Sequence, residues 1–183
     1  MNNLKVSLCV VAYNEEGFLP NLLNDFKKQT YPHGLTEIVL VDSVSTDNTK
    51  QIMQAFANED NGFYSVKVEQ NAKKVQASGW NVAITHATGD VIIRIDAHTH
   101  IPAEFTELNV KNLENGEAVS GGPRPCLIEN STNWKRTLLE VENSLFGSSI
   151  YKCRRETEKT YVKTMFHAAS RREVFENVGG FNE

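Results

Sequence analysis

The chain has 183 residues, of which 40% are hydrophobic and 23% charged, the ordinary balance of a globular domain with one core. Its formal net charge of -4 argues against a general nucleic-acid-binding surface, which needs an excess of lysine and arginine, but it allows a small basic site. Cys9, Cys126 and Cys153 match no disulfide framework or zinc motif, so we expect a reducing compartment and a buried Cys9. No stretch of the sequence has the pattern of a secretory signal or approaches the roughly 20 apolar residues of a membrane span.

The first half of the chain alternates apolar runs with helical patterns. The first run, Val6–Val11, precedes a helical stripe that ends at Phe26, with Asn14 as its predicted cap and Pro20 in its first turn. The later runs are Ile38–Val41, Phe63–Val68 and Val91–Ile95. Three runs are almost continuously apolar, which predicts strands covered on both faces, whereas the alternating run 63–68 indicates a strand nearer the edge of the sheet.

Two further helical stripes separate the later runs. They consist of Ile52, Met53 and Phe56, and of Val75, Gly79, Val82, Ala83 and Ala87. Asp47 is interpreted as a cap of the first stripe, and Gly89 as the stop of the second. Because strands and helices alternate throughout, the sequence predicts a doubly wound, mainly parallel α/β sheet flanked by helices.

The second half is less regular. We predict a short strand and turn at 119–122, an amphipathic helix from Trp134 to Phe146, a strand over Tyr161–Phe166 and a short helix from Arg171 to Asn177. Because the sequence ends soon after that helix and a Gly-Gly turn, we expect it to be part of a longer protein.

Polar side chains follow all four predicted strands of the first half. Ligands of open α/β sheets bind outside the carboxyl ends of the strands, so these segments are candidates for a nucleotide site. The segments are Ala12-Tyr13-Asn14-Glu15, Asp42-Ser43, Gln70-Asn71-Ala72-Lys73-Lys74 and Asp96-Ala97-His98. Their chemistry suits a nucleoside diphosphate: Tyr13 offers a ring to a base, Asp42 accepts hydrogen bonds, and Lys73 or Lys74 faces phosphate. Asp96 and His98 are candidate ligands of a divalent cation that stabilises the departing charge.

Each of these residues also has a structural interpretation. Asp42 is as consistent with capping as with binding, and Asn14 and Glu15 are equally consistent with capping the first helix. Lys73 and Lys74 would then be a solvated pair, and His98 and His100 surface residues. The coincidence of four strand ends favours the binding site over these separate explanations.

Several of these segments, in order along the chain, resemble family 2 glycosyltransferases of the GT-A fold. They are Val11–Glu16, Glu37–Thr49, Asn81 at the family's Arg-Asn pair, Ala87–Asp90, Ile95–His98 at its Asp-x-Asp motif, and Val178–Glu183. Within the family, the segment Ile93–His98 looks most similar to bacterial exopolysaccharide transferases of the succinoglycan-synthesis kind, which have Ile-Arg-x-Asp-x-His here. The resemblance covers nearly the whole chain and implies one glycosyltransferase domain over 1–183, truncated at its C-terminus. Residues 1–100 would form the nucleotide-sugar-binding half, and residues 101–183 the start of the acceptor-binding half.

The resemblance implies a role for each candidate residue. Ala12, Tyr13 and Glu15 match positions around the base and ribose, Asp42 matches the residue that binds the base, and Lys73 or Lys74 falls near a basic position facing the nucleotide. Asp96 and His98 match the two ends of the metal motif, for Mn or Mg. A histidine at the second end suits Mn better than Mg.

The implied reaction is the inverting transfer of a sugar from a nucleotide-diphosphate donor, typically a UDP-sugar, to a saccharide or lipid-linked acceptor in bacterial surface polysaccharide synthesis. Inversion follows from a single in-line displacement. The general base of the family lies after the Gly-Gly-Phe stretch, beyond Glu183, so we expect this sequence alone to transfer little sugar. His167 is an alternative polar site residue or a buried structural histidine. A cytoplasmic location, or the cytoplasmic face of the inner membrane with a membrane-associated full-length protein, is the family-level expectation.

Two other enzyme classes would need a different loop after the first strand. A sugar-1-phosphate nucleotidyltransferase would need a Gly-rich basic loop there, where this chain has Tyr13-Asn14-Glu15-Glu16, and a dehydrogenase would need Gly-x-Gly-x-x-Gly. A non-catalytic nucleotide-sugar-binding module would keep the same strand-end residues and remains the alternative.

Overall fold

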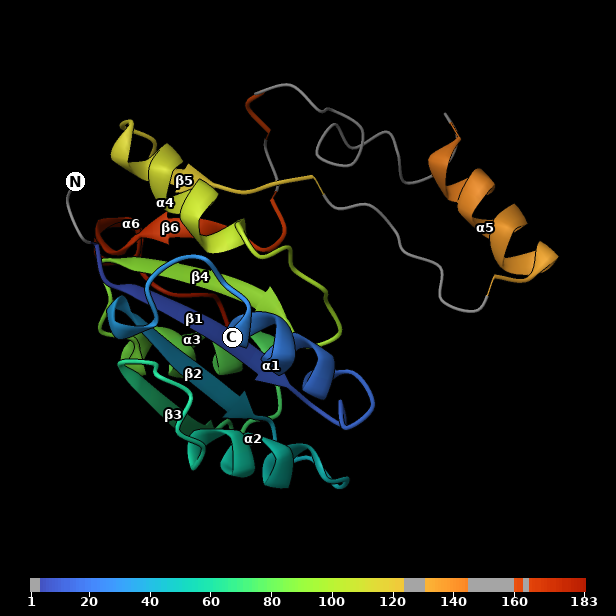
Figure 1. The fold of residues 1–183 in the computed structure, drawn as a ribbon, viewed down its shortest axis with the longest axis horizontal. Coiled ribbons are helices and arrows are strands. Elements are labelled where there is room, and N and C mark those ends of the chain that lie inside the picture. Colours follow the sequence, from blue (N-terminus) through green and yellow to red (C-terminus); the bar gives the residue numbers. More distant parts are fainter. Residues whose placement is uncertain (1–3, 124–130, 145–159, 163–164) are drawn as a thin grey trace. The chain divides into compact units, whose positions relative to one another are not determined.

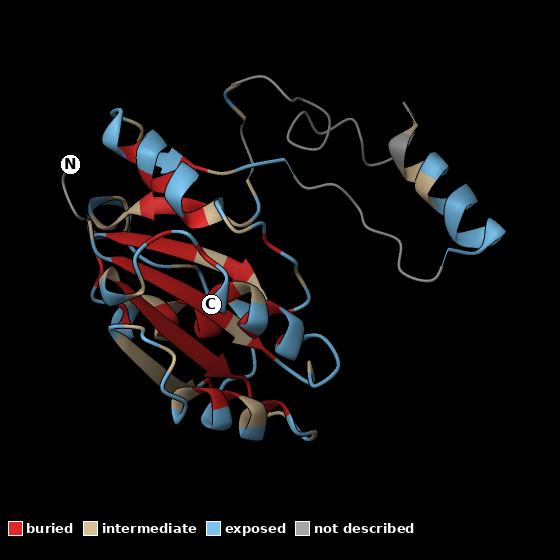
Figure 2. Cartoon of the chain, viewed as in Figure 1, coloured by how far each residue is buried: buried red, intermediate tan, exposed pale blue. Residues whose placement is uncertain are grey.

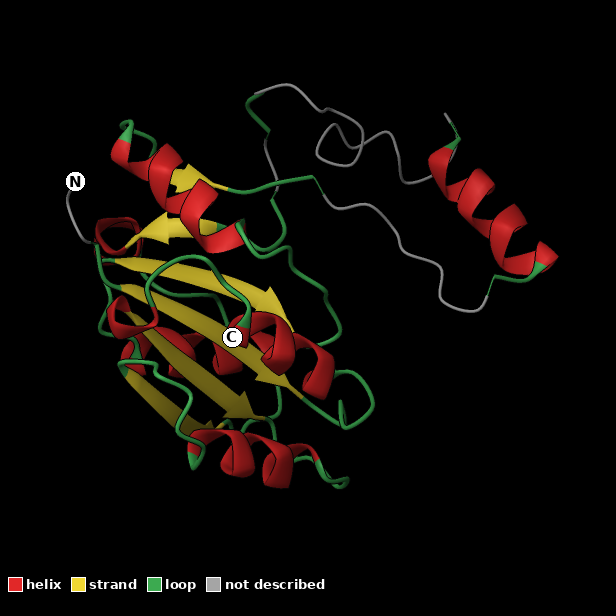
Figure 3. Ribbon diagram, in the orientation of Figure 1, coloured by secondary structure: helices red, strands yellow, loops and turns green. Residues whose placement is uncertain are grey.

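The structure is a computed structural model that describes residues 4–123, 131–144, 160–162 and 165–183. It comprises two compact units, a larger one formed by residues 1–120 and 167–183 and a smaller one formed by residues 121–166. The larger unit contains all six strands of the described residues (Figures 1 and 3). It also carries every candidate nucleotide and metal residue.

The larger unit is built on a single mixed sheet with the strand order β3-β2-β1-β4-β6-β5. The strands are β1 (Val6–Ala12), β2 (Thr36–Asp42), β3 (Ser65–Gln70), β4 (Val91–Asp96), β5 (Val119–Ser120) and β6 (Ala169–Arg171). The first four are parallel, and β6 joins β4 and β5 antiparallel to both. The predicted mainly parallel, doubly wound sheet is confirmed, and β3 is the edge strand that its alternating pattern indicated.

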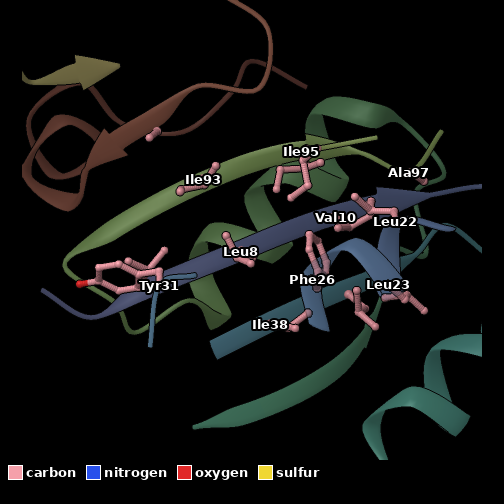
Figure 4. Close-up of a cluster of buried hydrophobic side chains, with 14 of the residues drawn as sticks. Leu8, Val10, Leu22, Leu23, Phe26, Tyr31, Ile38, Ile93, Ile95 and Ala97 are labelled. Carbon is pink, nitrogen blue, oxygen red and sulfur yellow. The ribbon is translucent and has the colours of Figure 1, made fainter. Parts of the chain in front are cut away.

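Helices cover both faces of this sheet, as Figure 1 shows for α1 and α2 in front and α3 behind. The helices of the larger unit are α1 (Leu19–Lys27), α2 (Thr49–Ala57), α3 (Gln76–His86), α4 (Phe105–Glu114) and α6 (Arg172–Val178). Side chains of α1, α2 and α4 pack with one face of β1, β2 and β4 in the main core, part of which Figure 4 draws. A second core contains Cys9, Val39 and Trp80 and packs α3 on the opposite face. The central strands are therefore buried on both sides, as their continuous apolar runs predicted (Figure 2).

The helical stripes are confirmed, but two details of the sequence prediction are wrong. Asn14 does not cap α1, because the helix begins at Leu19 after Phe18, and the Asn14 side chain instead contacts Thr46. The last strand is not over Tyr161–Phe166: the described residues there form no strand, residues 163–164 lie outside the description, and the strand is β6. His167, which follows the predicted segment and lies two residues before β6, has a φ of 48°, so the chain turns there before the strand begins.

A buried carboxylate joins three strands at the amino end of the sheet. Glu37 of β2, 2% exposed, accepts hydrogen bonds from Ser7, Lys67, Thr88 and Gly89. Burial by itself raises the pKa of Glu37, but these donors, Ser7 foremost, lower it to about 2. This network is at the end of the sheet opposite the candidate nucleotide residues, so we interpret it as structural.

The smaller unit contains one described helix, α5 (Asn133–Asn143), which confirms most of the helix predicted from Trp134 to Phe146. Ser144 after it is extended, and Leu145 and Phe146 lie outside the described residues. Thr132 caps α5 by accepting a hydrogen bond from the Lys135 N–H at 3.2 Å. No helix among the described residues is long and apolar enough to cross a membrane. Cys9 is fully buried, as predicted, while Cys126 and Cys153 lie outside the described residues.

Candidate nucleotide and metal site

Strand register brings the four polar segments to one edge of the sheet. Ala12 pairs with Asp42, Asp42 with Gln70, and Val11 with Asp96, so the carboxyl ends of β1 to β4 lie side by side. The chain order of the strands reverses between β1 and β4, which is where open α/β sheets bind their ligands. Tyr13, Asp42 and Asp96 therefore follow or end neighbouring strands along one rim, as the residue pattern predicted.

The loops after β1 and β2 are held together by side-chain hydrogen bonds. Asn14 Oδ1 accepts from the Thr46 N–H at 2.8 Å, and the Asn14 N–H donates to Ser45 Oγ at 3.0 Å. Glu16 Oε2 accepts from the Asn48 N–H at 3.0 Å. Since Tyr13 and Asp42 lie at the bases of these two loops, this inter-loop network fixes the two proposed base-binding positions relative to each other.

Asp42 is 1% exposed and lies at the end of β2. Its Oδ1 accepts a hydrogen bond from the Ser45 N–H at 3.1 Å, within the turn that follows the strand. Helix α2 begins seven residues later at Thr49, and there Asp47 Oδ1 accepts the Thr49 N–H at 2.9 Å. The N-cap residue of α2 is Asn48 and not Asp47 as predicted, although the Asp47 side chain does accept this N–H at the helix start and Asp42 does not. Ala12 is buried beside Asp42, whereas the Tyr13 side chain is 52% exposed and accessible to a ring that stacks on it.

Lys73 and Lys74 lie in the turn that follows β3. Asn71 braces this turn, because its buried amide donates to Ser43 Oγ at 3.0 Å and accepts from Ser78 Oγ at 2.7 Å. Lys74 is exposed and has a φ of 59°. Lys73 forms an ion pair with Glu183, which also accepts a hydrogen bond from Asn81 at 3.0 Å. The hydrogen bonds from Asn81 and Lys73 lower the pKa of Glu183.

The candidate metal ligands lie at the end of β4: Asp96 is the last residue of the strand, and His98 follows two residues later. His98 Nδ1 lies 3.2 Å from Glu15 Oε1, so the loop after β1 contacts the loop after β4. A carboxylate on one ring nitrogen orients many metal-binding histidines and leaves Nε2 to the ion. Among the described residues no group of three His, Cys, Asp or Glu side chains is placed to hold a metal. A carboxylate and an imidazole still fit a cation that takes its other ligands from the phosphates of a substrate.

The other two histidines have separate surroundings. His100 Nδ1 lies 2.9 Å from Asp25 Oδ2 of α1, whereas His98 contacts Glu15. His167 Nδ1 accepts a long hydrogen bond of 3.4 Å from the Asp96 N–H, and its Nε2 lies 3.4 Å from Thr99 Oγ1. His167 therefore supports the backbone of the turn that carries Asp96, a role that residue pattern alone did not reveal.

Sequence reasoning also missed the partners that hold the site together. The contact between Glu15 and His98 joins residues 83 apart in the sequence, and the contact between Asn81 and Glu183 joins residues 102 apart. The only signal for either was that each partner lay in a segment already singled out for its likeness to a known family.

Comparisons with known proteins agree on the family to which the chain belongs. The model of glycosyl transferase family 2 matches residues 7–179. The chain is 28% identical over 184 residues to the succinoglycan biosynthesis protein ExoA of Rhizobium meliloti, covering 97% of the chain and 53% of that protein. It is 35% identical over 103 residues to poly(ribitol-phosphate) beta-N-acetylglucosaminyltransferase TarS of Staphylococcus aureus, covering 55% of the chain and 17% of TarS. The chain thus spans only part of the length of these relatives.

Solved structures share the fold. Residues 1-349 of Staphylococcus aureus TarS in complex with UDP match with a TM-score of 0.71 at 22% identity, covering 98% of this chain and 50% of that one. The mannosyltransferase PcManGT from Pyrobaculum calidifontis, in complex with GDP-Man and Mn2+, matches with a TM-score of 0.68 at 23% identity, covering 98% and 48%. These likenesses confirm the predicted GT-A fold.

Proposed function

Because this chain belongs to glycosyl transferase family 2, we propose that it binds a nucleotide-diphosphate sugar and transfers the sugar to a saccharide or lipid-linked acceptor. The observation that carries the proposal is the alignment of Tyr13, Asp42 and Asp96 along the carboxyl edge of the parallel strands. UDP is the proposed nucleotide, which the UDP complex of TarS supports. The names of ExoA, a succinoglycan biosynthesis protein, and of TarS, a poly(ribitol-phosphate) beta-N-acetylglucosaminyltransferase, support an acceptor in the synthesis of a bacterial surface polysaccharide. The proposed location of this reaction is the cytoplasmic side of the membrane.

The nucleoside is assigned to the ends of β1 and β2. Asp42 is preorganised by the Ser45 N–H on Oδ1, and the proposed partner of its carboxylate is a base N–H. The exposed ring of Tyr13 stacks on the base, with Ala12 beneath it and Glu15 toward the ribose. The inter-loop network contributes by holding both loops in place before the nucleotide arrives, which lowers the entropy cost of binding.

The diphosphate is assigned to the ends of β3 and β4. Lys73 and Lys74 supply positive charge after β3. Asp96 and His98 are the proposed protein ligands of a divalent cation, with Glu15 orienting the imidazole. When bound, such a cation would neutralise charge on the nucleoside diphosphate as it leaves. The acceptor hydroxyl gives its proton to a general base and attacks the anomeric carbon from the opposite face, while the bond from that carbon to the diphosphate oxygen breaks. This single displacement inverts the configuration and releases the nucleoside diphosphate.

The substitution Asp42→Asn tests the assignment of the base. Asparagine is isosteric and keeps an acceptor for the Ser45 N–H, but it loses the charge that strengthens a hydrogen bond to a base. We expect UDP to bind at least about tenfold more weakly, measured by titration calorimetry with Mn²⁺ or Mg²⁺. Asp60→Asn, at an exposed carboxylate without described contacts, is the matched control and should bind UDP as the wild type does.

The outcomes separate the candidate functions. Failure of UDP, GDP and their sugars to bind the wild type would reject the proposal. Loss of metal-dependent UDP binding in Asp96→Ala supports the transferase site, whereas unchanged binding points to a different site. Nucleotide-sugar binding by a longer form of the protein that never releases UDP in the presence of acceptors would favour the non-catalytic binding module.

A further inference from the structure

Arg94 of β4 is a cation held by aromatic rings instead of by acceptors. Its guanidinium carbon lies 4.8 Å from the ring centre of Phe181 and 5.6 Å from that of Trp80. Among the described residues its side chain makes no hydrogen bond and no ion pair. The other described arginines, Arg136, Arg171 and Arg172, all donate hydrogen bonds from their side chains.

The fold builds this aromatic clamp from three separate segments. Trp80 of α3 is 5% exposed and belongs to the core beneath the sheet. Phe181 is fixed over Arg94 by the amide of Asn81, which accepts from the Phe181 N–H at 2.7 Å and donates to its carbonyl at 2.9 Å. A Cβ on Gly180 would lie 2.5 Å from Asn81 Oδ1, so only glycine allows this close approach. The position of Arg94 therefore follows from specific contacts.

The energetics of the clamp favour an anionic partner. Burial lowers the pKa of Arg94, and the nearby Asp96 opposes that shift, but a guanidinium keeps its charge in proteins. Removing a charge from water costs free energy unless hydrogen bonds and an opposite charge replace the water. Two aromatic faces supply part of this compensation but accept no N–H hydrogen bonds at the guanidinium edge. Arg94 is half-buried and none of its side-chain nitrogens is fully buried, so its N–H groups keep some contact with solvent.

The location of Arg94 connects it to the candidate site. Arg94 precedes Asp96 by two residues on β4, so both side chains leave the strand on the same face. Lys73 is already paired with Glu183, whereas the donors of Arg94 are unused. A planar guanidinium with parallel N–H groups matches the oxygens of a phosphate group in a two-pronged geometry.

We propose that Arg94, clamped between Trp80 and Phe181, forms a phosphate-binding subsite at the edge of the candidate nucleotide site. The proposal rests on the proposed function for the source of the phosphate, which is either the diphosphate of the donor or a phosphate group of the acceptor. In both cases the ligand accepts hydrogen bonds from the guanidinium edge while the rings hold its plane.

Trp80 provides a direct reporter of this subsite. The chain has two tryptophans, so a Trp134→Phe background leaves Trp80 as the sole emitter. Inorganic phosphate added to this protein should change the Trp80 emission, while sodium chloride at equal ionic strength and uridine should not. In the same background Arg94→Met, which keeps length and ring packing, should abolish the response. Arg94→Lys, which keeps charge without the two-pronged donors, should weaken it.

Calorimetry with UDP distinguishes the two sources and separates this proposal from the proposed function. Displacement of phosphate by UDP, with UDP affinity reduced about tenfold or more in Arg94→Met, assigns the subsite to the donor diphosphate. Phosphate binding that persists at saturating UDP assigns it to the acceptor. UDP binding that is equal in wild type, Arg94→Lys and Arg94→Met, together with no phosphate response at Trp80, would overturn the subsite while leaving the proposed function intact. Binding of phosphate without any binding of UDP would support the subsite and overturn the proposed function.

Discussion

Two residues in the linked loops after β1 and β2 have left-handed backbone conformations. Asn14 has a φ of 56° and Val44 a φ of 62°. Asparagine tolerates this region better than most residues, but a β-branched residue there is an outlier that costs free energy. Such strain is found where surrounding contacts hold a loop in one shape, and here the contacts are those of the inter-loop network.

The substitution of Asn14 tests that residue-scale interpretation. Asn14→Ala loses the hydrogen bond from Thr46 and puts a less tolerant residue at positive φ, so the free energy of unfolding should fall by about 1–2 kcal/mol. Asn14→Gly loses the same bond but relieves the backbone, and it should cost less. Urea denaturation gives the two values, and calorimetry should show weaker UDP binding in both variants. Equal stability of wild type and Asn14→Ala would argue against the network as a stabilising feature.

At the scale of elements, α3 packs on β1 more closely than a side chain at the contact would allow. A Cβ on Gly79 would lie 2.5 Å from Val11 Cγ1 and 3.1 Å from Asn71 Nδ2. The close approach brings α3 against the strand next to the switch point and lets Asn71 brace the turn before the helix. The packing of this helix thus shapes the loop that carries Lys73 and Lys74.

Gly79→Ala should therefore destabilise the protein although alanine favours helices. We expect the overlap with Val11 and Asn71 to lower the free energy of unfolding by about 1–3 kcal/mol, measured by denaturant titration. Gly34→Ala is the matched control, because a Cβ at Gly34 would meet no atom within 4 Å and its φ is not positive, so it should change stability by about 0.5 kcal/mol or less. A Gly79→Ala protein more stable than wild type would contradict the close packing.

At the scale of the whole molecule, the buried Glu37 couples three strands and the turn before β4 through one charged group. Its pKa of about 2 lies below the reference value of 4.5. A carboxylate with a lowered pKa in the folded state contributes stability that is fully present above the unfolded pKa. This contribution is lost as the pH falls from about 4.5 through the folded pKa of about 2.

Glu37→Gln should remove that pH dependence. We expect a loss of about 1–3 kcal/mol at neutral pH, because Lys67 and the N–H groups of the turn lose a charged acceptor. The difference in stability between the wild type and Glu37→Gln should shrink as the pH falls from about 5 to about 2 in urea titrations. Glu176→Gln, at an exposed residue without described contacts, should follow the wild type throughout. A constant difference between the wild type and Glu37→Gln at all pH values would show that the charge of Glu37 is not what stabilises the sheet.

The sequence by itself determined the sheet, the helices that cover it and the polar segments at its carboxyl edge. Apolar runs and helical stripes are local patterns, and parallel strands joined by helices place successive strand ends on one rim. Tyr13, Asp42 and Asp96 could therefore be predicted to lie together from the residues alone. Two predictions failed where tertiary contacts override the local pattern. The last strand was misplaced because the chain turns at His167, and Asn14 was misassigned as a cap because its side chain contacts Thr46.

Only the tertiary structure decided which distant side chains contact one another, both at that rim and at the opposite end of the sheet. The approach of Glu15 to His98, the closing of Phe181 over Arg94 and the gathering of donors around Glu37 each join segments distant in the sequence. No periodicity encodes such contacts, because they depend on strand register, on glycines that permit close approach and on the turn of each loop. The candidate site residues could be identified from the sequence, whereas the partners that contact them follow from its folding.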